Sequence, residues 1–290
     1  MPTPFLSALP PLVPIIGDRT TAAEADRLFI RPRPEVFKGR ERRDYSHSPL
    51  GSLPYSSPFP DSMRIPRREW PALIEYKQAQ RARLADLVLR SSPYLVSLDQ
   101  GGTNYCWCNA VVTCLELLRE LNNLPYYKLS AASVAAPIKS YRNNGGWGGE
   151  ALAYMIQNGI VPASIWPANA IDRAYDNAVS REARKHFKVS EFWELPPGDF
   201  EALASLLLHG KAAAIGLNWW RHEVAALDLV MIEGGAFGVL CRNSWGDDYG
   251  DGHGLFVLTE RKATPDDCCA PAVTTGTPAL PADLTIATAL

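Results

Sequence analysis

The sequence predicts an α+β fold, in which helices come early in the core-forming region and strands come late. Apolar residues recur at helical spacing in two segments, and short apolar runs of strand type follow them along the chain. The helices are expected over 107–121 and 149–158, and the strands over 211–217, 224–232, 237–241 and 254–258.

Composition places the chain among soluble globular proteins. It has 290 residues, of which 47% are hydrophobic and 21% charged, with a net charge of −2. This balance gives no reason to expect nucleic-acid binding, and no apolar run is long enough to cross a bilayer. The charge is uneven, because residues 1–95 carry 15 Lys/Arg against 10 Asp/Glu and the remainder carries 14 against 21. A basic N-terminal third is therefore expected to dock on an acidic body or an acidic partner.

The N-terminal third differs from the rest of the chain in its prolines. Fourteen of the 24 prolines precede residue 95, and proline is excluded from helix interiors and central strands. We expect an extended Pro-rich arm over 1–66, followed by a helix and linker over 67–94. The helix, predicted over 67–90, has an apolar stripe opposite Arg and Lys residues.

The remaining chain divides into a folded domain over 95–262 and a tail over 263–290, which is rich in Pro, Thr and Ala. An arm combined with a tail is typical of proteins held in large assemblies, including virus particles. The N-terminus is apolar but has no basic segment before its apolar stretch and contains five prolines in its first 19 residues, so no signal peptide is evident. Six cysteines are too few for a disulfide scaffold. We therefore expect an intracellular, cytoplasmic location or a virus particle.

Cys106 is the candidate nucleophile, because it directly precedes a predicted helix. The positive end of the helix dipole lowers a thiol pKa and favours the thiolate. Gln100 lies across a Gly-rich turn and can aim its amide at the same point, so the two residues supply a nucleophile and an oxyanion donor. Cys108 is interpreted as a packing residue. A zinc site is not expected, because no second Cys pair exists and Ala226 stands where a zincin has its second histidine.

His222 is the candidate base among five histidines, because it stands at the start of an apolar strand-type run. Asn243 ends another predicted strand, and its amide can orient an imidazole. Trp245, two residues further on, can shield that hydrogen bond from water. Together with Cys106, these residues fit the nucleophile, base and orienter arrangement of catalytic triads. We expect the His222 ring within about 4 Å of the Cys106 sulfur.

Five stretches in order resemble the papain-like cysteine peptidases: DQGGTNYCWCNA, LSAASV, NNGGWGGEALAYMIQNGI, RHEVAALDLV and RNSWGDDYGDGHGLFVL. The resemblance implies a helical left subdomain, a right subdomain with an antiparallel β-sheet or barrel, a peptide or protein substrate, and no cofactor or metal. It also implies the role of each site residue. These are Cys106 as nucleophile, His222 as base, Asn243 as orienter with Trp245 as its cover, Gln100 in the oxyanion hole, Gly145, Gly146 and Trp147 along the substrate cleft, and Glu223 at the cleft's second pocket.

Several features depart from the family pattern. Thr103 stands where the family often has a structural cysteine, and His222 follows Cys106 by 116 residues, a short spacing. Residues 1–95 take the place of a propeptide but lack the usual inhibitory helix motif.

Two paths for the arm are therefore open. It either crosses Gly145, Gly146 and Trp147 and blocks the cleft, or leaves the cleft open and tethers partner subunits; the prolines favour the tether. The functional alternatives to a peptidase are a structural or assembly protein with the same fold and a transamidating acyltransferase.

Overall fold

An eight-stranded sheet forms the centre of the computed structural model, which describes residues 13–31, 33, 35–91 and 94–275. The strand order is β1-β7-β6-β5-β4-β8-β3-β2, antiparallel from β7 to β3 and parallel at both edges. The strands are β1 Ile15–Ile16, β2 Ser56–Pro58, β3 Lys188–Leu195, β4 Ala213–Leu217, β5 His222–Met231, β6 Phe237–Arg242, β7 Leu255–Thr259 and β8 Asp267–Thr275.

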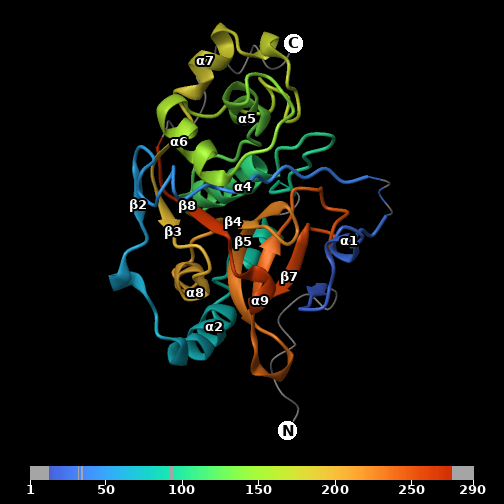
Figure 1. The fold of residues 1–290 in the computed structure, drawn as a ribbon, viewed down its shortest axis with the longest axis vertical. Coiled ribbons are helices and arrows are strands. Elements are labelled where there is room, and N and C mark those ends of the chain that lie inside the picture. Colours follow the sequence, from blue (N-terminus) through green and yellow to red (C-terminus); the bar gives the residue numbers. More distant parts are fainter. Residues whose placement is uncertain (1–12, 32, 34, 92–93, 276–290) are drawn as a thin grey trace.

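Helices pack around this sheet, some at one end of the molecule and others beside it and towards the opposite end (Figure 1). The α-helices are α1 Ala22–Ala25, α2 Trp70–Ala79, α3 Leu84–Arg90, α4 Cys106–Leu121, α5 Ala132–Ile138, α6 Gly148–Asn158, α7 Ala178–Arg184, α8 Phe200–Leu208 and α9 Glu260–Ala263. In the described part of the chain no helix is long and apolar enough to span a membrane. The expected α+β arrangement, with a helical and a β subdomain, is confirmed.

Helix α4 is the central helix, with its residues from 106 to 119 all buried. One hydrophobic core joins α4 to α5 and α6, and a second core lies between the sheet and α2 and α8. A helix that is apolar on nearly all sides is stable only when it is enclosed in this way. Because α4 is fixed between the two halves, its first residue, Cys106, is held at their junction.

The arm joins both edges of the sheet instead of standing apart from it. Near its start, Ile15 and Ile16 pair with β7, and near its end Ser56–Pro58 pair with β3. Ile16 and Phe59 are buried in the sheet core. Between these two attachments the arm runs across the molecule from α1 to β2 (Figure 1). The extended path predicted for residues 1–66 is therefore observed over the residues described, with short elements where it meets the sheet.

The single helix predicted over 67–90 is wrong. A turn separates α2 from α3, and Arg81 takes a positive φ of 50° there. The carboxylate of Asp228, on β5, accepts hydrogen bonds from the backbone amides of Leu84 and Ala85 and so caps the start of α3. This cap comes from a residue more than 140 positions away, so no local pattern announced it.

The tail predicted over 263–290 is also wrong in its first part. Residues 267–275 form β8, which lies between β4 and β3 inside the sheet, and Cys268 and Cys269 on it are buried. Pro271 and the neighbouring Thr residues gave the segment the composition of a tail, yet a register shift in the β3–β8 ladder occurs near this proline. Residues 276–290 lie outside the described part of the chain.

Candidate active site

Cys106 begins α4, at the junction of the two halves, and is fully buried. Its sulfur lies against the backbone amides of Trp107 and Glu223, both of which lower its pKa. Burial outweighs them and raises the pKa of the Cys106 thiol to about 12, helped by the nearby charge of Glu223. In this state burial therefore opposes the thiolate that the helix N-terminus was expected to favour. Cys108, interpreted as packing, is buried and donates its S–H to the Ala131 carbonyl.

His222 and Asn243 are joined by a hydrogen bond of 2.8 Å between the imidazole Nε2 and the amide Oδ1. Trp245 stacks on the imidazole with ring centroids 4.4 Å apart, so the pair is sealed from solvent. The other ring nitrogen, Nδ1, has no hydrogen-bond partner among the described residues. Glu223, whose amide contacts the Cys106 sulfur, directly follows His222 in β5. The imidazole is thus oriented by one nitrogen and left free at the other.

Gln100 lies in the turn before α4, where two contacts hold it to Ser244, in the segment that follows β6. Its backbone amide donates to the carbonyl of Ser244, and the Ser244 hydroxyl donates to its side-chain Oε1. These contacts fix which end of the amide faces the cleft. The Nε2 end donates to the carbonyls of Phe37 and Thr103, at 2.9 and 2.8 Å. The donor expected to serve an oxyanion is therefore occupied by a carbonyl of the arm.

The arm crosses the cleft residues, so the expectation of an open cleft with an outward tether is wrong. Gly146 donates its amide hydrogen to the carbonyl of Gly39 and accepts a hydrogen bond from the amide of Glu41, both at 2.8 Å. Arg40, between them, pairs with Gly146 as in a parallel ladder. This pairing uses the backbone groups that would bind an extended peptide. The arm can bind there because its backbone is extended over these residues.

Glycine is required where the arm passes closest to the domain. A Cβ on Gly39 would overlap the backbone carbonyl of Asn104, and a Cβ on Gly145 would overlap the carbonyl of Gly39. Beyond this point Arg43 lies over the Trp147 ring, 4.5 Å from its centroid, so Trp147 lies beneath the arm. A cavity of about 460 Å³ remains beside the arm, bordered by Gly39, Asn104 and Gly145.

The arm also changes the electrostatics of the imidazole. Burial lowers the pKa of His222 to about 3, and the positive charge of Lys38 lowers it further. The hydrogen bond that the imidazole donates to Asn243 acts in the opposite direction. Lys38 is held by an ion pair of 2.7 Å with Asp26, which is itself in the arm. With the arm in place, the thiol and the imidazole are therefore both neutral.

The structure joins Cys106 to Glu223, and it joins His222 to Asn243 and Trp245. The expected distance between the His222 ring and the Cys106 sulfur stays a prediction. The structure also adds three residues that the sequence did not indicate. Ser244 orients Gln100, Phe37 occupies its donor, and Arg40 enters the site beside Glu223. The first lies inside the Asn-Ser-Trp motif and could have been examined for that reason. The two arm residues have no local signal, because their role depends on where the arm runs.

The fold defined by these elements is that of the papain-like cysteine peptidases. Digestive procathepsin L 3 of Tenebrio molitor has a TM-score of 0.54 and 20% identity, over 63% of this chain and 68% of that one. The bromelain protease from Ananas comosus has a TM-score of 0.53 and 16% identity, over 63% of this chain and 96% of that one. The resemblance expected from the sequence is confirmed at the level of fold.

Sequence comparison finds distant relatives that are named as cathepsins. Two curated proteins of Paramecium tetraurelia, Cathepsin L 1 and Cathepsin L 2, are each 26% identical over 170 residues. The match covers 53% of this chain and 53% of each relative, so the chain spans about half the length of the curated relatives it matches. No family model matches the chain.

Proposed function

We propose that the chain is a cysteine peptidase that cleaves peptide bonds with Cys106, His222 and Asn243, and that the arm holds it in a latent state. The observation that carries this is the position of His222. Its Nε2 is bound to Asn243 beneath Trp245, its Nδ1 is free, and the next residue touches the Cys106 sulfur. A general base needs one fixed nitrogen and one free nitrogen.

The reaction follows from these groups once a substrate replaces the arm. The Cys106 thiol gives its proton to His222 Nδ1, and the sulfur attacks the peptide carbonyl carbon. Gln100 Nε2 and the Cys106 amide hold the resulting oxyanion, and His222 then protonates the leaving amine. Water, deprotonated by the same imidazole, attacks the thioester and releases the acid product and the free thiol.

Latency follows from two properties of the closed state. The carbonyl of Phe37 occupies the oxyanion donor, and Gly39 and Glu41 occupy the backbone groups of Gly146. The buried thiol and imidazole are both neutral in this state, because burial raises the pKa of Cys106 and lowers that of His222. Displacement of residues 37–41 would admit solvent and remove Lys38 from the imidazole, and both changes favour the thiolate–imidazolium pair.

A thiol-directed epoxide tests the nucleophile. We expect it to modify Cys106 in the full chain carrying Gly39→Ala, which loosens the arm, and to leave Cys106→Ala unmodified. Cys106→Ala should lower peptide hydrolysis by at least about 10³-fold. Cys108→Ala is the matched control, because its sulfur faces Ala131 in the core, and it should retain most labelling and hydrolysis. Modification of Cys108 by the epoxide, or full hydrolysis by Cys106→Ala, would contradict the proposal.

The other predictions made from the sequence remain predictions. Transamidation uses the same groups and differs only in whether water or an amine attacks the thioester, which analysis of the products distinguishes. A role in a particle, partner subunits bound through the arm or tail, and an intracellular location also stay predictions. All six cysteines are free thiols, which fits a reducing compartment.

A further inference from the structure

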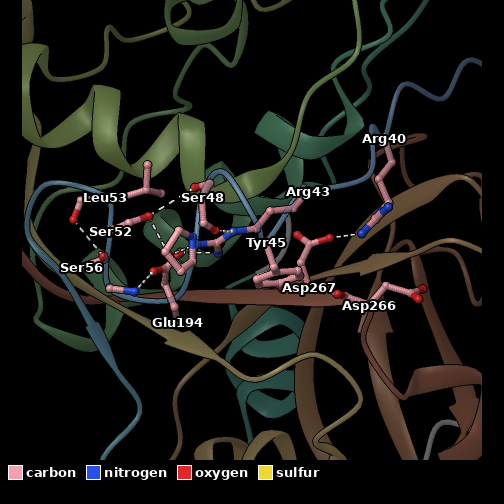
Figure 2. A network of polar contacts seen from close by, with 12 residues as sticks. Arg40, Arg43, Tyr45, Ser48, Ser52, Leu53, Ser56, Glu194, Asp266 and Asp267 are labelled. Atoms are coloured by element: carbon pink, nitrogen blue, oxygen red, sulfur yellow. Dashed lines mark hydrogen bonds and ion pairs between the residues drawn. The ribbon is translucent and has the colours of Figure 1, made fainter.

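Arg40 extends from the arm into a buried acidic pocket. Its Nη2 pairs with the carboxylate of Asp267, and its Nη1 donates to the side-chain oxygen of Asn218. The side chains of Arg40 and Asp267 are 2% and 3% exposed, so the pair is removed from water. Figure 2 shows the guanidinium directed at Asp267, well apart from Arg43, which pairs with Glu194. The pocket therefore holds one arginine side chain and is separate from the site of the other.

The sheet builds this pocket by its register. Gly216 on β4 lies directly opposite Glu223 on β5 and directly opposite Asp267 on β8. Residues opposite each other in neighbouring strands project to the same face. The row is thus carboxylate, glycine, carboxylate, with open space above the glycine. A Cβ on Gly216 would overlap both the Arg40 Nε and the Asp267 carboxylate, so the missing side chain is what makes room for the guanidinium.

Glu223 adds a second carboxyl group to the pocket, and the arm makes no hydrogen bond to it. It is fully buried, and neither of its carboxylate oxygens has a hydrogen-bond partner of good geometry in the described chain. Burial raises the pKa of Glu223 to about 8, although the charge of Arg40 and the Gly148 amide oppose the rise. The Nε of Arg40 is also unpartnered. The pocket therefore holds hydrogen-bonding groups that Arg40 does not satisfy in the arm.

The pocket lies beside the reacting groups. Glu223 follows His222, and its amide touches the Cys106 sulfur. Arg40 lies between the two arm residues that pair with Gly146. A peptide paired with Gly146 in the same way would send one side chain to this place. Side chains of an extended chain alternate between its two faces, so the pocket contacts the side chain of a single residue of the peptide.

We propose that this pocket selects an arginine side chain of the peptide substrate, in the place that Arg40 occupies in the arm. The inference rests on the proposed peptidase function and names its substrate class. The planar guanidinium reaches Asp267 and Asn218 with two nitrogens, which a single ammonium cannot do. An aliphatic side chain would leave the buried carboxylate of Asp267 without its cation.

Binding to the vacated pocket tests the proposal without catalysis. In the full chain with Arg40→Ala, propylguanidinium, which is the arginine side chain as a free molecule, should raise Tm by about 2 °C at about 10 mM. The wild type should not respond, because Arg40 fills its pocket. Adding Asp267→Asn should abolish the response, whereas Asp248→Asn, on an exposed carboxylate that pairs with Arg31, should not. The proposed pocket would be contradicted if propylguanidinium did not raise the Tm of Arg40→Ala. It would also be contradicted if the rise in Tm were equal in the double variant Arg40→Ala with Asp267→Asn.

Peptide preference gives the second test and does not need the vacated variant. In Gly39→Ala protein, peptides differing at one position should be cleaved with kcat/KM about 10²-fold higher for arginine than for norleucine and about tenfold higher than for lysine. Asp267→Asn should reduce the arginine-to-norleucine ratio at least about tenfold, and Asp248→Asn should not change it. A preference for norleucine would overturn the selection. If propylguanidinium raises the Tm of Arg40→Ala but no peptide is hydrolysed, the peptidase function is contradicted and the arginine-binding pocket is still supported.

Discussion

The side-chain amide of Gln100 donates a hydrogen bond of 2.9 Å to the backbone carbonyl of Phe37, 63 positions earlier in the chain. Trp245 donates its indole N–H to the same carbonyl at 3.1 Å. A carbonyl oxygen of the protein itself therefore lies where the oxyanion of a substrate would accept the proposed hydrogen bond from Gln100.

Gly39→Ala should loosen the crossing of the arm. The added Cβ would overlap the backbone carbonyl of Asn104, which cannot move aside as a side-chain end can. We expect the rate of Cys106 modification by an epoxide to rise about tenfold or more, equivalent to about 1.4 kcal/mol lost from the closed state. Gly17→Ala is the control, because its Cβ would meet only the Thr20 hydroxyl at 4.0 Å. Equal rates in both variants would show that residue 39 does not limit access.

Gln100→Ala should lower kcat by about 10²–10³-fold, because one oxyanion donor is lost. Ser244→Ala should have a smaller effect, about tenfold, since it removes only the hydroxyl that fixes the Gln100 amide. The double variant should be no slower than Gln100→Ala alone, as expected for a residue acting through another. Ser190→Ala, on β3, is the control. An additive double variant would mean that Ser244 acts independently of Gln100.

Asn243→Ala should lower kcat on the order of 10²-fold, because the imidazole loses the bond of 2.8 Å that sets its orientation. Asn243→Gln keeps the amide but moves it by one methylene, so activity should stay low. If Asn243→Ala changes KM alone, the amide does not orient the base. Steady-state kinetics in the Gly39→Ala background separates the two outcomes.

Glu223→Gln should increase stability most at high pH. Burial raises the pKa of Glu223 to about 8, so the folded protein holds a proton that the unfolded chain has already released above about pH 5. Because the folded state binds more protons in this window, the stability contributed by Glu223 is lost as pH rises from about 5 to about 8. The Tm difference between variant and wild type should therefore grow across that range. Glu201→Gln, at an exposed position, is the control.

Deleting residues 1–66 should destabilise the fold strongly, whatever it does to the cleft. The deletion removes both edge strands and the buried side chains of Ile16 and Phe59, each worth about 1.5–3 kcal/mol. We expect the thermal unfolding transition, measured by circular dichroism, to lose its cooperativity. Deleting residues 1–12, which leaves every described residue in place, is the control. A cooperative transition within a few degrees of the full chain would show that the arm is not part of the core.

The central part of the fold could be predicted because its signals are local. The periodicity of α4 and α6 and the apolar runs of β4–β7 matched their expected ranges closely. The site residues could be proposed because motif spacing and residue chemistry identify them independently of the rest of the chain. Their contacts agree with that proposal at His222 and Asn243.

The errors arose where distant residues decide the structure. β8 has the composition of a tail and is a strand because β4 and β3 are available on either side. The start of α3 depends on Asp228, and the path of the arm depends on Gly146 and on the acidic pocket for Arg40. The thiol of Cys106 was expected to ionise from its place on α4, but its pKa depends on burial beneath other segments. None of these can be read from a window of neighbouring residues.

The arm is attached to the sheet on both sides of the cleft, by β1 at one edge and β2 at the other. A single break in the backbone near residues 38–43 would therefore open the cleft and leave each piece bound at its own edge. The cleaved protein would migrate as two bands under denaturing conditions and as one particle under native conditions. No inhibitory peptide would diffuse away, so dilution would neither speed activation nor prevent a return to the closed state. Opening would be a property of each single molecule, independent of concentration.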